Sequence, residues 1–168
     1  TNTLSFGISC CVWEAAEAIQ RGAGAEQAAA AAATVAPTVS SVTTLQALEF
    51  TRAQGRLVEF LPADADGIPV LALVDGEAKT VGEGRSIDEL CQMMVNEMVA
   101  GGQPIRAALC VADRSAAPLY EAMDAMLRSR PEVVALVHYR VGPSIGAFVG
   151  PGAAGGFWFG CTDARPSS

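Results

Sequence analysis

The stretch IPVLALVDGEAKTVGEG, residues 68–84, contains two β-type runs on either side of Asp75-Gly76. An Asp-Gly pair between two such runs is a strong signal for a β-hairpin, because these residues tolerate the positive backbone φ angles of a tight turn. The segment therefore predicts two antiparallel strands, the first over 69–74. Two later apolar runs, over 105–111 and 133–139, are bounded by helical patterns and are predicted to be strands as well.

Helical patterns separate these strands. Ser86 and Glu89 predict a capping box at the start of one helix, and Pro118 is tolerated in the first turn of another. The apolar positions of these two helices are Ile87, Leu90, Cys91, Met94, Met98, Leu119, Ala122, Met123 and Met126. Alternating strands and helices predict an α/β fold, and the hairpin makes the β-sheet a mixed one flanked by helices.

The first 40 residues read as a helical lead-in within a single domain over 1–168. The expected elements up to residue 55 are helices over 12–19, 25–36 and 43–55 and a short strand over 39–42. In the first helix, Val12, Ala15, Ala16 and Ile19 recur at helical spacing, which predicts its buried face. Thr43 is the expected N-cap of the third helix.

Composition excludes several classes of function. The net charge is −7 and lysine and arginine do not cluster, which argues against nucleic acid and anionic membranes as partners. No apolar run reaches the roughly 20 residues that span a bilayer. The chain has five cysteines without CxxC spacing and one histidine, which predicts reduced, buried thiols in a cytoplasmic protein and no metal site. The cysteines are Cys10, Cys11, Cys91, Cys110 and Cys161.

Residues 144–160, SIGAFVGPGAAGGFWFG, combine glycines with aromatic side chains. Gly150-Pro151-Gly152 is expected to form a tight turn, either purely structural or at a functional site. Phe157 and Phe159 either line an apolar cavity or alternate inward on a final strand. We expect GPGAAGG, 150–156, to lie between two strands, which is the wrong context for a phosphate-binding loop.

Three motifs in a fixed order carry a family resemblance. They are VTTLQALEFTRAQGRL, IPVLALVDGEAKTVGEGRSIDEL and VGPSIGAFVGPGAAGGFWFG. Together they resemble the C-terminal part of the DegV family, the bacterial fatty-acid-binding proteins, and residues 1–24 fit the segment that precedes it. The resemblance implies a DegV-like C-terminal lobe, with no counterpart here of the family's N-terminal lobe.

The resemblance also implies a function and a set of residues. Family members hold one long-chain fatty acid between two lobes, and some present its carboxylate to a fatty acid kinase, without catalysis or cofactor of their own. The family's His-Thr before Gly-Pro-Gly is Phe148-Val149 here, so Phe148, Val149 and the 150–152 turn are the implied ligand-binding residues. Arg85 and Arg56 are the implied partner-facing residues, with solvated surface charges as the alternative.

Other functions remain open. An enzyme is disfavoured because Ser144 has only the distant His138 as a base and no Gly-x-Ser-x-Gly elbow is present. The main rival is a degenerate interaction or dimerisation module that no longer binds fatty acid, with an apolar face exposed where the missing lobe would dock. Asp113, after a predicted strand, either caps the next helix or serves a functional site at the strand end.

Overall fold

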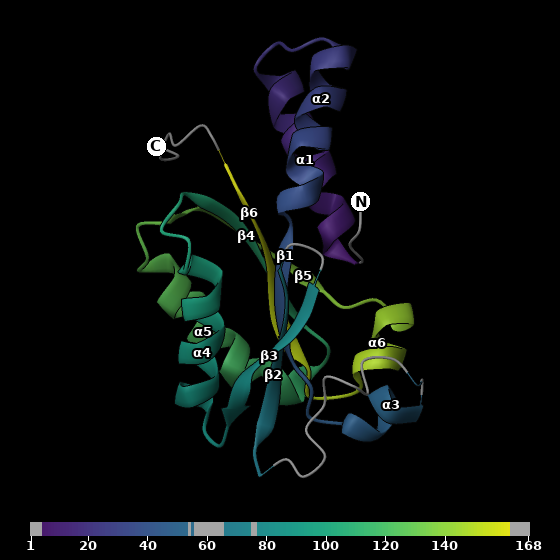
Figure 1. Ribbon diagram of the computed structural model, residues 1–168, viewed down its shortest axis with the longest axis vertical. Helices are drawn as coiled ribbons and strands as arrows, with labels where there is room; N and C mark the ends of the chain where they lie inside the picture. The colour runs from purple at the N-terminus through teal and green to yellow at the C-terminus, as the bar shows by residue number, and fades with distance from the viewer. Residues whose placement is uncertain (1–4, 54, 56–65, 75–76, 162–168) are drawn as a thin grey trace.

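The computed structural model describes residues 5–53, 55, 66–74 and 77–161, and a six-stranded sheet organises them (Figure 1). The strands are β1 Ser40–Thr44, β2 Ile68–Val74, β3 Glu77–Gly84, β4 Ile105–Val111, β5 Val133–Arg140 and β6 Ala154–Gly160. Their order across the sheet is β3-β2-β1-β6-β4-β5, and every neighbouring pair is antiparallel except β4 and β5. The predicted α/β fold with a mixed sheet is therefore confirmed.

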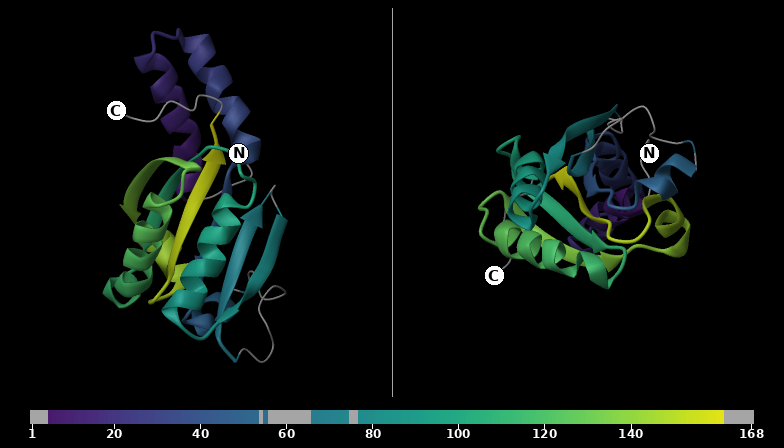
Figure 2. Two further views of the ribbon diagram at one scale, coloured as in Figure 1. Left: turned by 90° about the vertical axis from the view of Figure 1, so that its left-hand side faces the viewer. Right: turned by 90° about the horizontal axis from the view of Figure 1, so that it is seen from below.

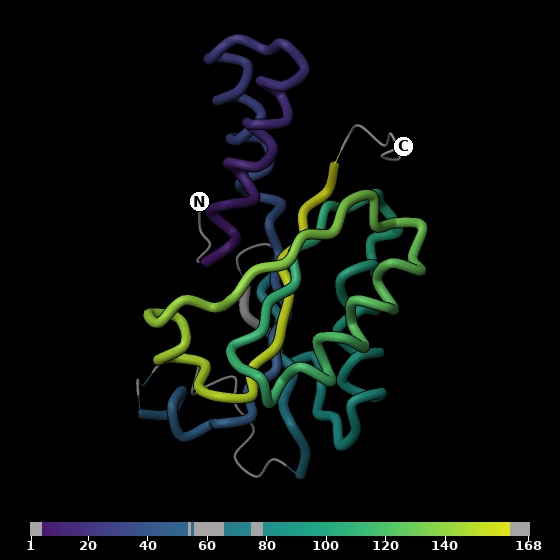
Figure 3. The backbone as a smooth tube through the Cα atoms, turned by 180° about the vertical axis from the view of Figure 1, so that it is seen from behind, coloured from purple at the N-terminus to yellow at the C-terminus, as the bar shows by residue number. Residues whose placement is uncertain are grey.

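Helices cover the two faces of the sheet unequally. They are α1 Phe6–Gln20, α2 Ala25–Val35, α3 Leu48–Ala53, α4 Ile87–Val99, α5 Ala117–Arg128 and α6 Pro143–Val149, with short 3₁₀ turns η1 Ala36–Thr38 and η3 Arg114–Ala116. We call the side on which α4 and α5 lie the covered face. On the opposite, partly covered face, α1 lies at one end and α3 with α6 at the other, and the α1–α2 hairpin extends past the sheet (Figures 1, 2 and 3).

The three strands predicted from apolar runs form at the expected positions. The expected segments 69–74, 105–111 and 133–139 are confirmed as β2, β4 and β5, within one residue at each end. Val74 pairs with Glu77 across the hairpin, whose predicted turn, Asp75-Gly76, lies outside the described residues.

Helix α4 has the predicted cap in a shifted form. The Ser86 hydroxyl accepts a hydrogen bond from the Glu89 backbone N–H at 3.2 Å, as expected of an N-cap. The Glu89 carboxylate accepts from the backbone N–H of Arg85 at 2.7 Å, one residue before the group that a capping box uses. Ile87 is exposed rather than buried, because it occupies the first turn and points away from the sheet that Leu90 and Met94 cover.

The prediction that Thr43 caps a helix over 43–55 is wrong. Thr43 and Thr44 belong to β1, which runs beyond the expected 39–42, and α3 begins only at Leu48. β1 lies between β2 and β6, so its backbone is hydrogen-bonded on both sides up to this point. Pairing with two neighbouring strands outweighs the local preference of threonine for a cap.

The predicted buried face of α1 is also wrong. Val12 and Ile19 are 63% and 58% exposed, whereas Cys10, Cys11 and Ala18 are buried. The helix lies on the aromatic side chains Phe157 and Phe159 of β6 through Cys10 and Cys11, with the Trp13 ring packed edge-on against Phe159. The pattern of large aliphatic residues therefore faces away from the sheet.

β6 carries the largest core side chains on both sides of the sheet. Trp158 packs under α4 and α5 on the covered face, while Phe157 and Phe159 pack under α1. The alternative in which the two phenylalanines alternate inward on a final strand is thus confirmed. The helix α6, which was not predicted, precedes the GPGAAGG segment, so the expectation that this segment lies between two strands is corrected. All five cysteines have free thiols, and all but Cys161 are buried.

Candidate functional site

The chain segments that the sequence singles out meet at one end of the sheet. β6 is antiparallel to both β1 and β4, and it begins where they end, with Gly155 opposite Thr43 and Ala154 opposite Val111. β5 ends at the same edge because it is parallel to β4. Loops after strand carboxyl ends are where α/β folds place ligands, and α3, α6 and the turn before β6 all lie here (Figure 1).

The predicted turn forms at Gly150-Pro151-Gly152 and requires both glycines. Gly150 and Gly152 have φ angles of 70° and 79°, in the left-handed region that side chains other than glycine rarely adopt. A Cβ on Gly150 would lie 2.8 Å from the Ala47 Cβ, and one on Gly152 would lie 2.8 Å from Gln46 Oε1. The turn is therefore packed tightly against the segment that links β1 to α3.

Asp113 fixes the turn from the side of β4. Its Oδ2 accepts a hydrogen bond from the Gly152 N–H at 2.8 Å, while its Oδ1 accepts from the Ser115 backbone and hydroxyl at 2.7 and 2.6 Å. The hydrogen bond from the Ser115 hydroxyl, followed by those from Gly152 and the Ser115 N–H, lowers the pKa of this carboxyl. Asp113 is the N-cap of η3, which was one of the two alternatives offered by the sequence. Its side chain also binds the turn at Gly152, 39 residues further along the chain.

Threonine hydroxyls complete the hydrogen bonding around the turn. Thr44 Oγ1 accepts from the Ala154 N–H and donates to the Ala154 carbonyl, each at 3.2 Å. Thr43 Oγ1 donates to the same carbonyl at 3.2 Å, and Thr51 Oγ1 donates to the Phe148 carbonyl at 3.1 Å. Thr44 is fully buried. Its hydrogen bonds with Ala154 continue the β1–β6 pairing by one residue beyond the last strand pair, Thr43 with Gly155.

Apolar side chains surround the turn on the partly covered face. Leu45 and Leu71 are buried beneath half-buried Leu48 and Val149, which come from α3 and α6. Phe148 is half-buried, so the structure brings together the implied ligand-binding residues Phe148, Val149 and the 150–152 turn. This end of the sheet combines an apolar surface with a rigid backbone turn.

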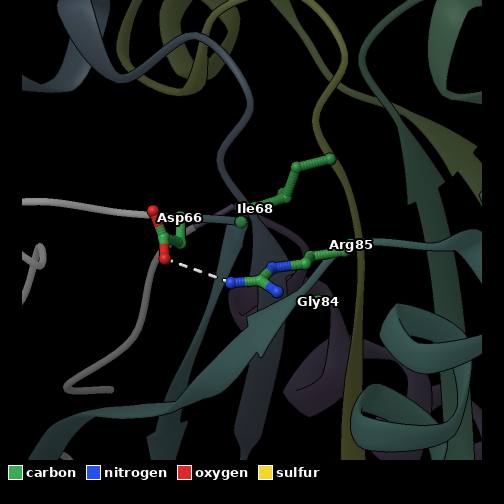
Figure 4. A pocket seen from close by; sticks show the side chains of 5 residues that line it. Asp66, Ile68, Gly84 and Arg85 are labelled. Carbon is green, nitrogen blue, oxygen red and sulfur yellow. Dashed lines mark hydrogen bonds and ion pairs between the residues drawn. The ribbon is translucent and has the colours of Figure 1, made fainter.

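Arg85 follows β3 at the same end of the sheet, where two strands, β2 and β1, separate it from β6. Its guanidinium pairs with the Asp66 carboxylate at 3.1 Å, and both side chains are exposed. They border a shallow cavity of about 420 Å³ that Gly67, Ile68 and Gly84 complete (Figure 4). Arg56 lies outside the described residues.

The histidine does not join this site. His138 Nε2 lies 2.7 Å from Asp124 Oδ1, and the ring contacts Tyr120 edge-on, so His138 ties β5 to α5 on the covered face. In the part of the chain that the structure describes, no three His, Cys, Asp or Glu side chains are placed to hold a metal ion. No described helix is both long enough and apolar enough to cross a bilayer.

Comparison with protein families gives one match. The sequence profile described as "Uncharacterised protein, DegV family" matches residues 1–160. No curated protein shows significant similarity to the chain.

Solved structures share the fold at low sequence identity. A DegV family protein of Corynebacterium glutamicum superposes with a TM-score of 0.79 at 17% identity, over 98% of this chain and 64% of that one. A DegV family protein of Thermus thermophilus, whose structure is titled for fatty acid binding, gives 0.78 at 21% identity over 95% and 59%. DegV of Bacillus subtilis, described as a fatty acid binding protein, gives 0.70 at 20% identity over 95% and 58%. The chain thus spans about three fifths of the length of these proteins.

Proposed function

Because this chain belongs to the DegV family, we propose that it binds one long-chain fatty acid or a related single-chain lipid and carries it without catalysing a reaction. The structures with the same fold from Thermus thermophilus and Bacillus subtilis are described as fatty acid binding, which supports this reading. We further propose that the chain forms the C-terminal lobe of a two-lobed carrier.

The observation that carries the proposal is the partly covered face of the sheet. Between α1 and the α3–α6 pair, Leu73 of β2 and Val137 of β5 are only half-buried, although both alternate onto this face with core residues. The face ends at the apolar side chains Leu48 and Val149 beside the glycine turn. An alkyl chain laid along it would remove this apolar surface from water, at about 25 cal/mol for each Å² covered.

A kinase partner belongs to the same proposal. Arg85 is exposed beside the cavity that it shares with Asp66, on the edge where the lipid head would emerge. We propose that Arg85, with Arg56, faces a fatty acid kinase in the cytoplasm. Arg85→Glu should then lower the rate of lipid phosphorylation by the kinase while leaving lipid affinity unchanged. Equal rates for the two proteins would remove Arg85 from the partner surface.

Lipid carriage can be tested with two substitutions of equal exposure on opposite faces. Phe50 of α3 is 41% exposed beside the turn, and Ile87 of α4 is 42% exposed elsewhere. Both positions should tolerate glutamate without loss of the fold. We expect Phe50→Glu to weaken binding of a fluorescent long-chain lipid by about tenfold or more, since a charge would be buried against the chain. Ile87→Glu should bind like the wild-type protein.

Mass spectrometry of the purified full chain supplies the direct measurement. We expect one acyl chain per protein molecule in native spectra. Absence of co-purified lipid together with no binding of added lipid would refute carriage.

The second candidate, an interaction or dimerisation module that has lost its lipid, is favoured by α1. Ile8, Val12 and Ile19 form an exposed aliphatic row on this helix, consistent with the apolar face expected from the sequence. A further lobe or a second copy of the chain would cover them. Sedimentation measures the oligomeric state of the wild-type protein and of Val12→Glu. If the chain associates with itself through this row, the added charge should make it monomeric. If the wild-type protein is already a monomer, the substitution should leave its sedimentation unchanged.

A further inference from the structure

The two edge strands of the sheet differ in how they are protected. β3 and β5 are the outermost strands, so each has one side without a neighbouring strand among the described residues. β3, EAKTVGEG, contains three charged residues and two glycines, and its register with β2 shifts between Val70 and Leu71. Charges, glycines and irregular pairing all hinder the addition of another strand. The edge formed by β3 is therefore poorly suited to pairing.

The edge formed by β5 has little of this protection. The strand reads VVALVHYR, without glycine or proline, and Arg140 is its only Lys, Arg, Asp or Glu residue. Its pairing with β4 shifts register only at the start, so the stretch from Ala135 to Arg140 is regular. In Figure 3 the light green trace of β5 passes in front of the other strands. A regular, apolar edge strand is a template for a further strand.

The hydrogen bond just after β5 shows which of its backbone groups face the open edge. The Val141 N–H donates to the Val111 carbonyl at 3.3 Å, so odd-numbered residues in the regular part of β5 direct their backbone groups toward β4. Successive residues of a strand direct these groups to opposite sides. Leu136, His138 and Arg140 therefore present their N–H and C=O groups at the open edge. An extended chain placed there would complete a second row of backbone hydrogen bonds.

The charges at the two ends of β5 favour a second copy of the same strand. Glu132 directly precedes β5 and Arg140 ends it, and neither forms an ion pair within the described part of the chain. One carboxylate oxygen of Glu132 is even buried without a hydrogen-bond partner. Arg130 is held instead by Asn96 of α4, at 3.3 Å. Antiparallel pairing of two β5 strands brings the Glu132 end of each beside the Arg140 end of the other, whereas parallel pairing brings like charges together.

We propose that the open edge of β5 pairs in antiparallel orientation with β5 of a second copy of the chain, so that the two sheets form one continuous sheet. The twofold axis of such a pair is perpendicular to the sheet, which places the partly covered faces of both copies on the same side. This interaction goes beyond lipid carriage and does not depend on it. It also uses a surface separate from the exposed aliphatic row of Ile8, Val12 and Ile19 on α1.

Sedimentation velocity of the full chain tests the pairing. We expect a reversible monomer–dimer equilibrium as the protein concentration is raised about 100-fold from the micromolar range. His138→Pro removes an edge-facing N–H from both copies and should weaken the dimer by about 30-fold or more. His138→Ala is the matched control, because it loses the same contact with Asp124, at 2.7 Å, but keeps the backbone N–H. Its dimer should dissociate within about threefold of the wild-type protein.

Charge reversal tests the antiparallel orientation. Glu132→Arg and Arg140→Glu each bring like charges together and should weaken self-association by about tenfold. An equimolar mixture of the two variants restores opposite charges at both ends of the pairing and should form a heterodimer. Glu26→Arg makes the same charge change on an exposed residue of α2, so it should leave self-association unaltered and should not restore it when mixed with Arg140→Glu. Circular dichroism verifies that each variant is folded.

Each other outcome rejects a stated part of the proposal. A monomer over the whole concentration range would refute pairing through β5 and leave lipid carriage untouched. A dimer that withstands His138→Pro but dissociates in Val12→Glu would assign the association to α1 instead. Equal weakening by His138→Pro and His138→Ala would trace the effect to the Asp124 contact, and the assignment to the open edge would be wrong. A mixture of the charge variants that stays monomeric would exclude the antiparallel orientation.

Discussion

Removal of the Arg106 guanidinium should strongly weaken the attachment of α1 to the sheet. Arg106 lies on β4, and its guanidinium pairs with the Glu14 carboxylate of α1, with side chains only 10% and 14% exposed. Glu17 lies 4.0 Å away, and the guanidinium sits 5.8 Å from the centre of the Trp13 ring. The pair is thus enclosed between the helix and the sheet.

The cost follows from this burial. Deleting one partner of a buried ion pair leaves the other charge without compensation and typically costs about 3–5 kcal/mol. For a chain of 168 residues, each kcal/mol corresponds to about 2–4 °C in Tm. We therefore expect Arg106→Met to lower the free energy of unfolding by about 3–5 kcal/mol and Tm by about 6–20 °C.

Arg21 pairs with the same two carboxylates, Glu14 and Glu17, and therefore provides a matched control. Its guanidinium lies 3.4 Å from Glu14 and 3.9 Å from Glu17, but its side chain is 45% exposed. An exposed pair contributes about 0–1 kcal/mol, so Arg21→Met should unfold almost like the wild-type protein. Urea titrations followed by circular dichroism measure both variants. A loss under 1 kcal/mol for Arg106→Met, or equal losses for the two variants, would show that water solvates Glu14 and would refute the reasoning.

The remaining predictions concern the turn, its surroundings and the thiols. Phe148→His should tighten fatty acid binding by about 10- to 150-fold by adding one charge-assisted donor, and unchanged affinity in calorimetry would place residue 148 away from the head group. Gly152→Ala should cost about 1–3 kcal/mol because φ is 79°, whereas Gly146→Ala in α6, where a Cβ meets open space, should be stabilising in the same denaturation assay. The lowered pKa of Asp113 means that its contribution is fully present above pH 3.8 and is lost as pH falls through the folded-state pKa, so the stability deficit of Asp113→Asn should be largest at neutral pH and shrink in acid. Burial raises the pKa of Cys10 to about 12, so iodoacetamide at pH 8 should label it in urea but hardly in the native protein, and rapid native labelling would indicate that α1 opens readily.

The sequence by itself determined the elements whose signals are local. The Asp75-Gly76 hairpin signal, the apolar runs of β4 and β5 and the Ser86 cap each depend on residues a few positions apart, so these signals can be recognised without knowledge of any distant contact. The order of three motifs was also enough to indicate the family.

Only the tertiary structure decided which face α1 buries, where β1 ends and how the turn is held. Val12 and Ile19 show a valid helical pattern, but the aromatic side chains of β6 pack against the opposite side of the helix, which carries Cys10, Cys11 and Trp13. The contact between Asp113 and Gly152 depends on the β4–β6 register, which sets residues 39 positions apart side by side. Such pairings are fixed by the packing of the whole sheet, and no local propensity specifies which distant strand will be the neighbour.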